Sequence, residues 1–237
     1  LNTIELLKIN STFMIVQNKF NFKRLIFVIN IFISQPSFSQ DSIDYSINAS
    51  LLTEADQLII KQKISFINQN NSLNKIYLND WANSYSSTKS PLADRLVEEY
   101  TRSFYLSAKS KRGYTLISNI YVNGTLGKWK RNDKNLDIIE IIFEKPLKKG
   151  IVTIDLSYII KLPSSKFTGY GKIKKDQYFL QNFFITLSNF DGIKQTFYSN
   201  LDLEEDPINS SKFKVELRID KDLNAYSSLD LKDFNKE

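Results

Sequence analysis

Short runs of alternating apolar and polar residues dominate the chain from residue 42 onward. One run covers positions 43–51, and after a turn at Glu54–Asp56 another covers 58–67. Successive side chains of a strand point to opposite faces of its sheet, so this period of two predicts strands with one buried face. In the second run Ile60, Ile64 and Phe66 share that face with Gln62. The two runs together predict the first hairpin of an antiparallel sheet.

Similar runs recur along the rest of the chain, separated by turns rich in Asn, Asp, Lys and Gly. They predict further strands at 75–79, 115–123, 126–131, 136–144, 151–162, 177–185, 195–199 and 212–219, with a turn at 145–150. About ten strands at this spacing are typical of a β-sandwich. The expected fold is therefore mainly β, an antiparallel β-sandwich or a pair of saddle-shaped sheets.

One helix is expected to interrupt the strands. Ser90 has a side chain suited to an N-cap, and Pro91 fits the first helical position. Leu92, Leu96 and Tyr100 follow at the four-residue spacing of a helix with one apolar face. The pattern predicts an inserted helix that ends near residue 105.

The first 39 residues have the three parts of a secretory signal peptide. Lys19, Lys23 and Arg24 precede the short apolar run 25–33, and Ser37 and Ser39 then stand at the small-residue positions of a cleavage site. The run is too short for a permanent transmembrane anchor. The alternative is a buried strand or helix of the fold. We expect a signal peptide at 1–39, a β-domain at 40–220 and an exit segment at 221–237, in a protein exported to the periplasm or beyond the cell.

Composition excludes several kinds of chemistry. The 237 residues include no histidine and no cysteine, so the chain lacks the usual ligands of zinc and cannot form a Ser–His or Cys–His nucleophile pair. The formal charge is +6, but without residues 1–39 it falls to +3, with 28 basic and 25 acidic side chains left. The lysines are scattered along the sequence at strand ends and turns. No nucleic-acid partner is therefore expected.

Five ordered stretches resemble the N-terminal domain of the gluzincin, or membrane alanyl, zinc aminopeptidases, in the form common among Bacteroidetes-type bacteria. Together they extend from about residue 43 to 230, and no single one is diagnostic. The stretches are 44–51 with 58–68; the aromatic-rich 75–85; 146–150 with 153–163; 167–171; and 178–184.

The resemblance implies a domain without a catalytic centre. In that family a sandwich-like first domain precedes a thermolysin-like catalytic domain, which holds zinc through a His-Glu-x-x-His helix absent from this sequence. The first domain forms a wall of the peptide-substrate cleft, and one of its glutamines helps hold the free amino group of the substrate. Gln181 is the best match to that glutamine, and an amide oxygen can accept a hydrogen bond from an ammonium group. Alternatively, Gln181 is a strand residue that points into solvent.

Two functions from different classes follow. The first is the non-catalytic domain of an exported zinc aminopeptidase, inactive alone, with no metal or catalytic residue of its own and with a catalytic metallopeptidase domain as partner. In that case the chain ends where the family finishes its first domain. The alternative is a stand-alone cell-envelope module that binds carbohydrate or protein. Trp81, Tyr85, Tyr121 and Trp129 could stack on a ligand in that module, or pack in the core or a domain interface.

Overall fold

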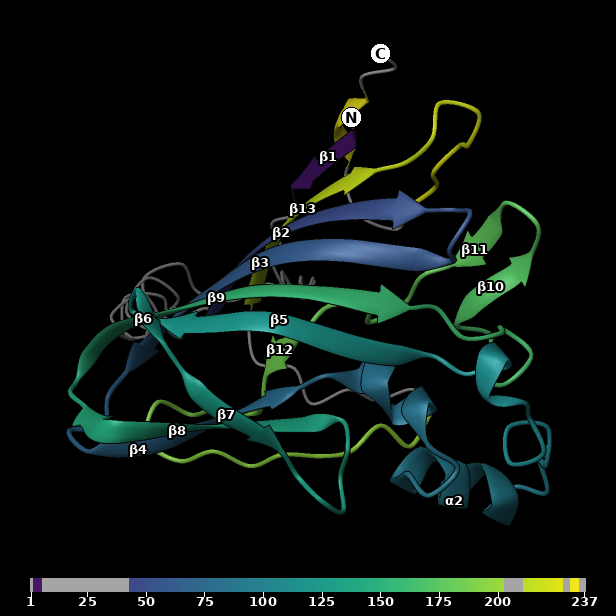
Figure 1. The fold of residues 1–237 in the computed structure, drawn as a ribbon. Helices are drawn as coiled ribbons and strands as arrows, with labels where there is room; N and C mark the ends of the chain where they lie inside the picture. The colour runs from purple at the N-terminus through teal and green to yellow at the C-terminus, as the bar shows by residue number, and fades with distance from the viewer. Residues whose placement is uncertain (1, 6–42, 203–210, 228–230, 235–237) are drawn as a thin grey trace, which may run out of the picture.

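The structure, a computed structural model, describes residues 2–5, 43–202, 211–227 and 231–234 (Figure 1). Its larger sheet has the strand order β14-β1-β13-β2-β3-β9-β5-β6. These strands are β1 (Asn2–Glu5), β2 (Ile43–Leu52), β3 (Gln57–Asn68), β5 (Tyr114–Val122), β6 (Thr125–Leu126), β9 (Gly150–Lys161), β13 (Ser211–Arg218) and β14 (Leu231–Phe234). The predicted signal peptide lies, apart from β1, outside the described residues and stays a prediction.

The alternation of apolar and polar residues in the sequence matches the alternation of buried and exposed side chains in the larger sheet. In β2, β3 and β9 every second side chain is buried, and the antiparallel register sets Ile60 beside Tyr158 and Ile64 beside Ile154. Burial of one such aliphatic side chain contributes about 1.5–3 kcal/mol. A slip of one residue would expose the whole apolar row, so the pattern itself fixes the register. The expected first hairpin, β2 with β3, is confirmed.

A second sheet faces the first across the core. Its order is β12-β4-β8-β7, and Figure 1 shows β4, β7 and β8 below β9 and β5. The strands are β4 (Leu73–Asn79), β7 (Lys128–Arg131), β8 (Ile138–Leu147) and β12 (Thr186–Leu187). Buried residues of both sheets belong to one apolar cluster, with Ile76, Leu78, Ile139 and Ile141 from the smaller sheet. The predicted mainly β fold of packed sheets is confirmed.

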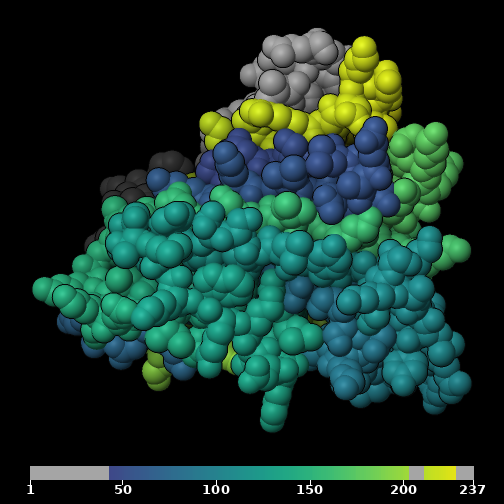
Figure 2. Space-filling model, in the orientation of Figure 1, coloured from purple at the N-terminus to yellow at the C-terminus, as the bar shows by residue number. Residues whose placement is uncertain are grey.

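A small hairpin lies at the edge of the larger sheet. Its strands are β10 (Gly171–Lys174) and β11 (Gln177–Phe179). In Figure 2 it protrudes in green beside the blue end of the β2–β3 hairpin. An ion pair from Lys172 to Asp56 joins the two hairpins, with Nζ 2.6 Å from Oδ1.

The helical part is shorter than the sequence predicted. Helix α2 (Pro91–Glu98) begins at the expected cap, where the Ser90 hydroxyl accepts a hydrogen bond from the Ala93 N–H at 3.3 Å. It ends seven residues before the predicted position 105. Tyr100 has a left-handed φ of 59° and is 91% exposed, so it does not extend the apolar face. Two 3-10 helices flank α2 in sequence, η1 (Trp81–Ser86) and η2 (Lys109–Lys111).

Four other expectations are corrected. β13 pairs with β2 in parallel, although only antiparallel pairs were expected. Residues 145–147 belong to β8, so the turn begins at residue 148. The predicted strand 177–185 is β11 alone, followed by an irregular segment. The predicted strand 195–199 is an extended segment with a single bridge, Phe190 to Gln195.

Candidate functional site

Gln181 lies at a small hollow formed by four segments of the chain. Trp81 and Tyr85 enter it from η1, and Thr168 and Tyr170 from the loop before β10. The hollow measures about 40 Å³, room for a few water-sized atoms. The other lining residues are Ala82, Asn182, Asn200 and Asp202. Stretches 75–85, 167–171 and 178–184, which the sequence analysis singled out separately, therefore meet at one place.

The Gln181 side chain is free to bind a ligand. It is exposed at the rim, and within the described part of the chain its amide makes no hydrogen bond. It does not belong to a strand, because β11 ends at Phe179 and Asn182 adopts a left-handed φ of 45°. The irregular backbone thus presents Gln181 at the hollow, where a regular strand would have continued along the sheet edge.

Aromatic side chains form the base of the hollow. The Tyr85 ring lies 5.5 Å from that of Tyr170 and 6.0 Å from that of Phe104. Tyr85 Oη is 2.6 Å from Thr168 Oγ1, which joins η1 to the loop before β10. Burial raises the pKa of Tyr85 to about 12, so its hydroxyl stays protonated at neutral pH. Tyr121 and Trp129 lie elsewhere, partly exposed on β5 and β7.

Two polar atoms of the lining residues lack partners. Within the described residues, Trp81 Nε1 and the Tyr170 hydroxyl are buried and make no hydrogen bond. A buried donor left unpaired costs about 1–3 kcal/mol. Such groups beside a hollow are candidates for contact with a bound polar molecule.

The hollow also contains a carboxylate. Asp202 lines it, and its backbone N–H donates to Asn200 Oδ1 at 2.9 Å. Partial desolvation raises the pKa of the Asp202 carboxyl, and the nearby negative charge of Glu99 raises it further. A cation bound beside Asp202 would relieve both effects, because it stabilises the ionised form.

A buried ion pair supports η1 from below. Asp80, directly before η1, is 1% exposed and pairs with Arg131 at 2.7 Å. Burial raises the pKa of Asp80, opposed by the charge of Arg131 and the hydroxyl of Thr115, which donates at 2.7 Å. Asn83 completes the network: its Oδ1 accepts from the Thr115 N–H and its Nδ2 donates to the Leu136 carbonyl. Removing one member would leave a buried polar group or charge unpaired, so the network holds η1 in place.

A second carboxylate, Asp137, holds the segment that contains Asn200. Its two oxygens accept from the Asn200 N–H at 2.6 Å and from the Ser199 hydroxyl at 2.9 Å. Asn200 in turn donates to Ser84 Oγ of η1 at 2.9 Å. Burial raises the pKa of Asp137 to about 6, although these hydrogen bonds oppose the shift.

The segment after Gln181 is anchored to the inner face of the large sheet. Gln62 forms a two-way amide pair with the backbone of Ile185, and Tyr158 donates to Gln62 Oε1. Tyr45 accepts from the Leu187 N–H at 3.0 Å. These contacts hold the chain four residues beyond Gln181 and thereby limit the movement of that residue.

Sequence reasoning identified Gln181, Trp81 and Tyr85 but missed the residues that position them. Arg131 and Asp137 fall at the ends of the predicted strands 126–131 and 136–144, and Asp80 directly follows the predicted strand 75–79. The one available signal was this position at or next to a strand end, where a polar side chain can turn into the core.

Neither a metal cluster nor a membrane span appears in the described structure. No group of three or more acidic side chains gathers there as a metal site would require. No described helix is long and apolar enough to cross a bilayer.

Comparison with known proteins gave structural similarities only, because no family model and no curated protein matches the sequence. An M1 zinc metallopeptidase from Deinococcus radiodurans is 12% identical with a TM-score of 0.34, over 76% of this chain and 32% of that one. A two-domain M1 zinc metallopeptidase mutant bound to L-arginine is 13% identical with a TM-score of 0.30, over 51% and 20%. Native leukotriene A4 hydrolase from Saccharomyces cerevisiae is 11% identical with a TM-score of 0.30, over 55% and 18%. The chain spans about a third or less of these solved chains.

Proposed function

We propose that this chain is the non-catalytic first domain of an exported zinc aminopeptidase and forms one wall of its substrate cleft. The observation that supports the proposal is the meeting of three family-like stretches at one hollow. That hollow contains Gln181, the residue matched to the family's substrate-binding glutamine. The zinc ligands would belong to a separate catalytic domain, since this chain has no histidine.

The chemistry of the hollow suits a peptide amino terminus. The Gln181 amide oxygen can accept a hydrogen bond from an ammonium group, and the Asp202 carboxylate can balance its charge. Trp81 and Tyr85 supply an apolar wall for the first side chain of a peptide. A volume of about 40 Å³ accommodates such a terminal group but no whole peptide, as expected where a second domain supplies the opposite wall.

The same proposal requires an exposed apolar surface for the catalytic domain. Ile59, Ile159 and Leu116 form a row across β3, β9 and β5 on the outer face of the large sheet. Ile59 is 41% exposed and Leu116 is 55% exposed. In this proposal the row is part of the docking surface, since apolar patches of this kind often mark interfaces.

The test uses Trp81 as a reporter of the hollow. Trp129→Phe leaves Trp81 as the one tryptophan, and alanyl-alanine amide is titrated against its N-acetylated form. Binding of the free amine is expected with a dissociation constant on the order of 1 mM, because one wall supplies few contacts. Gln181→Ala should weaken it about tenfold, the usual effect of losing a hydrogen bond to a charged group. Gln177→Ala, at an exposed position on β11, is the matched control.

Three results would contradict the proposal. They are equal affinity for the free and acetylated amides, no effect of Gln181→Ala, or an equal effect of Gln177→Ala. If neutral sugars quench Trp81 and the peptides do not, the cell-envelope binding module becomes the better assignment. The purified chain with added zinc should also cleave no aminoacyl nitroanilide, and turnover that follows the protein through repurification would contradict that expectation.

A further inference from the structure

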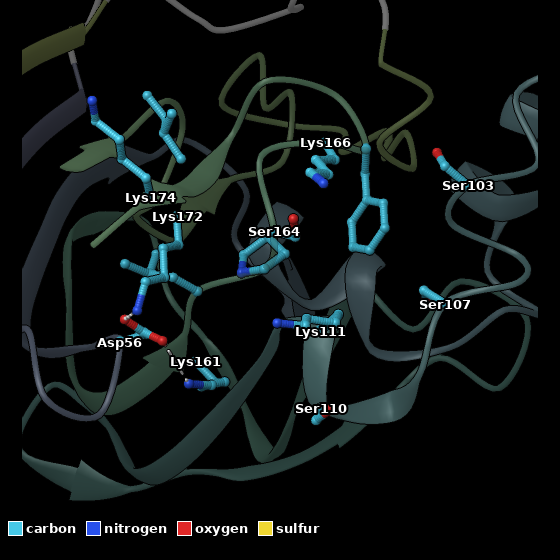
Figure 3. Close-up of a pocket in the computed structure, with 14 residues that line it drawn as sticks. Asp56, Ser103, Ser107, Ser110, Lys111, Lys161, Ser164, Lys166, Lys172 and Lys174 are labelled. Carbon is cyan, nitrogen blue, oxygen red and sulfur yellow. Dashed lines mark hydrogen bonds and ion pairs between the residues drawn. The ribbon is translucent and has the colours of Figure 1, made fainter. Parts of the chain in front are cut away.

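A larger and strongly basic pocket is lined by the first part of the loop before β10, whose second part lines the hollow. Thr168 and Tyr170 line the hollow, whereas Pro163, Ser164, Lys166 and Phe167 line this pocket, which has a volume of about 480 Å³ (Figure 3). That volume is within the range of small-molecule sites. The charged residues that line it are one carboxylate, Asp56, and five lysines: Lys111, Lys161, Lys166, Lys172 and Lys174. The formal net charge of its wall is therefore +4.

Two of the five lysines are already paired. Asp56 accepts from Lys172 at 2.6 Å and lies 3.5 Å from Lys161 Nζ, and Figure 3 shows all three at one side of the pocket. Burial alone would raise the pKa of Asp56, but hydrogen bonds from Lys172 and Tyr178 and the charge of Lys161 outweigh it and lower the pKa. Asp56 therefore remains ionised at neutral pH and is the counter-ion of Lys161 and Lys172, and the other lysines keep the pocket basic.

The other three lysines have no acidic partner within the described residues. Lys111 comes from η2, Lys166 from the loop before β10 and Lys174 from the end of β10. In Figure 3 Lys111 reaches toward the middle of the pocket, and Lys174 lies at its outer edge. All three side chains are exposed to solvent, and a bound anion would supply the counter-ion that the described residues do not.

The backbone around these lysines is tightly built. The Ser164 N–H donates to the Lys111 carbonyl at 2.9 Å, and the Lys172 N–H donates to the Pro163 carbonyl at 2.8 Å. Gly171 makes the second contact possible, because a Cβ at that position would lie 2.1 Å from the Pro163 oxygen. The three segments that supply the lysines are thus held in fixed relation, as a preformed site requires.

Hydroxyl groups and apolar atoms complete the lining. Ser103, Ser107 and Ser110 come from the segment between α2 and β5, and Figure 3 shows Ser103 and Ser107 across the pocket from the Asp56 cluster and Ser110 below Lys111. Phe167 and Leu162 supply apolar wall. The Ser107 hydroxyl already donates to the Phe104 carbonyl at 2.6 Å, whereas the hydroxyls of Ser103 and Ser110 can donate to anionic oxygens. The apolar wall suits the uncharged body of a small organic molecule.

We propose that this pocket binds a phosphate monoester, either a free sugar phosphate or the phosphorylated headgroup of a lipid. A phosphate monoester presents about two negative charges and three strong acceptor oxygens in a compact group. The unpaired lysines and the serine hydroxyls of the pocket match that group, and the remaining volume accommodates its carrier. The residues are scattered in sequence, at positions 56, 103–111 and 161–174, and only the fold brings them together.

Calorimetry on the full chain in phosphate-free buffer tests this site. The probes are glucose 6-phosphate with glucose as its neutral control, and phosphatidylcholine vesicles with and without phosphatidic acid. Lys111→Ala/Lys166→Ala should weaken binding about tenfold or more, because it removes two unpaired cations without exposing a buried charge. Lys148→Ala/Lys149→Ala removes the same charge from an exposed turn and should leave affinity nearly unchanged.

Each outcome decides something. Binding of glucose 6-phosphate alone identifies a soluble ligand, and binding of the phosphatidic acid vesicles alone identifies a lipid headgroup; both support the phosphate site. The proposal is overturned if neither probe binds, if glucose binds equally, or if the turn variant weakens binding as much as the pocket variant. Thermal unfolding of each variant shows whether it is folded. The Lys172→Ala variant is unsuitable because it would leave Asp56 short of its principal partner.

Discussion

Replacement of Asp137 by asparagine should stabilise the protein at neutral pH, although it removes a carboxylate with two hydrogen bonds. Asp137 is 0% exposed and accepts from the Asn200 N–H and the Ser199 hydroxyl. An asparagine can keep both contacts, since its oxygen accepts from Asn200 and its amide group donates to Ser199 Oγ. The substitution therefore removes mainly the cost of ionising a buried acid.

The magnitude follows from the pKa of this group. Burial raises it from 3.8 to about 6. Each tenfold change in an ionisation constant equals about 1.4 kcal/mol, so ionised Asp137 lowers the free energy of unfolding by about 3 kcal/mol. Well below pH 3.8 the group is protonated in both states and costs nothing. As the pH rises from about 4 to about 6 the unfolded chain loses the proton first, so stability falls across that window and stays lower above it.

Urea unfolding from pH 4 to pH 8, followed by circular dichroism, measures the difference. Asp137→Asn should match the native chain near pH 4 and exceed it by about 3 kcal/mol at pH 7. Asp133→Asn, an exposed position in the same loop, is the control and should follow the native curve. The lowered pKa of Asp56 acts at more acidic pH and does not overlap this window. Parallel curves for the native chain and Asp137→Asn from pH 4 to 7 would refute the assignment.

Three further substitutions test the packing that supports both sites. Ile154→Ala, in the core, should lower the free energy of unfolding by about 2–5 kcal/mol. Ile151→Ala, at a side chain of the same strand that is 72% exposed, should change it by less than about 0.5 kcal/mol. Equal effects of the two variants in urea unfolding would contradict the assigned sheet face. Gly171→Ala should lower the free energy of unfolding by about 2 kcal/mol more than Gly169→Ala. Both glycines have a left-handed φ, but only a Cβ at position 171 would clash with the Pro163 oxygen. Similar melting temperatures of the two variants would argue against that close contact. Gln62→Met should cost about 3 kcal/mol, because it leaves the buried Tyr158 hydroxyl without its acceptor and the Ile185 carbonyl without its side-chain donor. Calorimetric unfolding like that of the native chain would show that these bonds are not formed.

The regular strands could be predicted from the sequence because each has one buried face. In β2, β3 and β9 the alternation of apolar residues coincides with the alternation of buried positions. Even Gln62 lies on the buried face as predicted, and its amide is hydrogen-bonded there to the backbone of Ile185. The alternation alone is sufficient to predict a strand whose buried face packs on an apolar layer, because that packing does not depend on which strand pairs with it.

The segment 195–199 shows why the same reasoning fails elsewhere. Its apolar and polar residues alternate as in a strand, yet the Gln195 side chain, and not its backbone, pairs with the backbone of Tyr77 in β4. Its Oε1 accepts from the Tyr77 N–H at 2.7 Å, and its Nε2 donates to the Tyr77 carbonyl at 2.6 Å. An amide side chain and a peptide group offer the same donor and acceptor, so sequence pattern cannot tell which one pairs with a strand edge.

Gly171 joins the two candidate sites in a way that no sequence motif displays. Tyr170 lines the hollow and Lys172 lines the basic pocket, so the residues on either side of this glycine face different sites. Its φ of 110° and its close approach to Pro163 set the direction of both neighbours. A substitution at Gly171 should therefore disturb both sites together. Gln181 lines only the hollow, and Lys111 and Lys166 line only the basic pocket, so their variants can separate the amino-group proposal from the phosphate proposal.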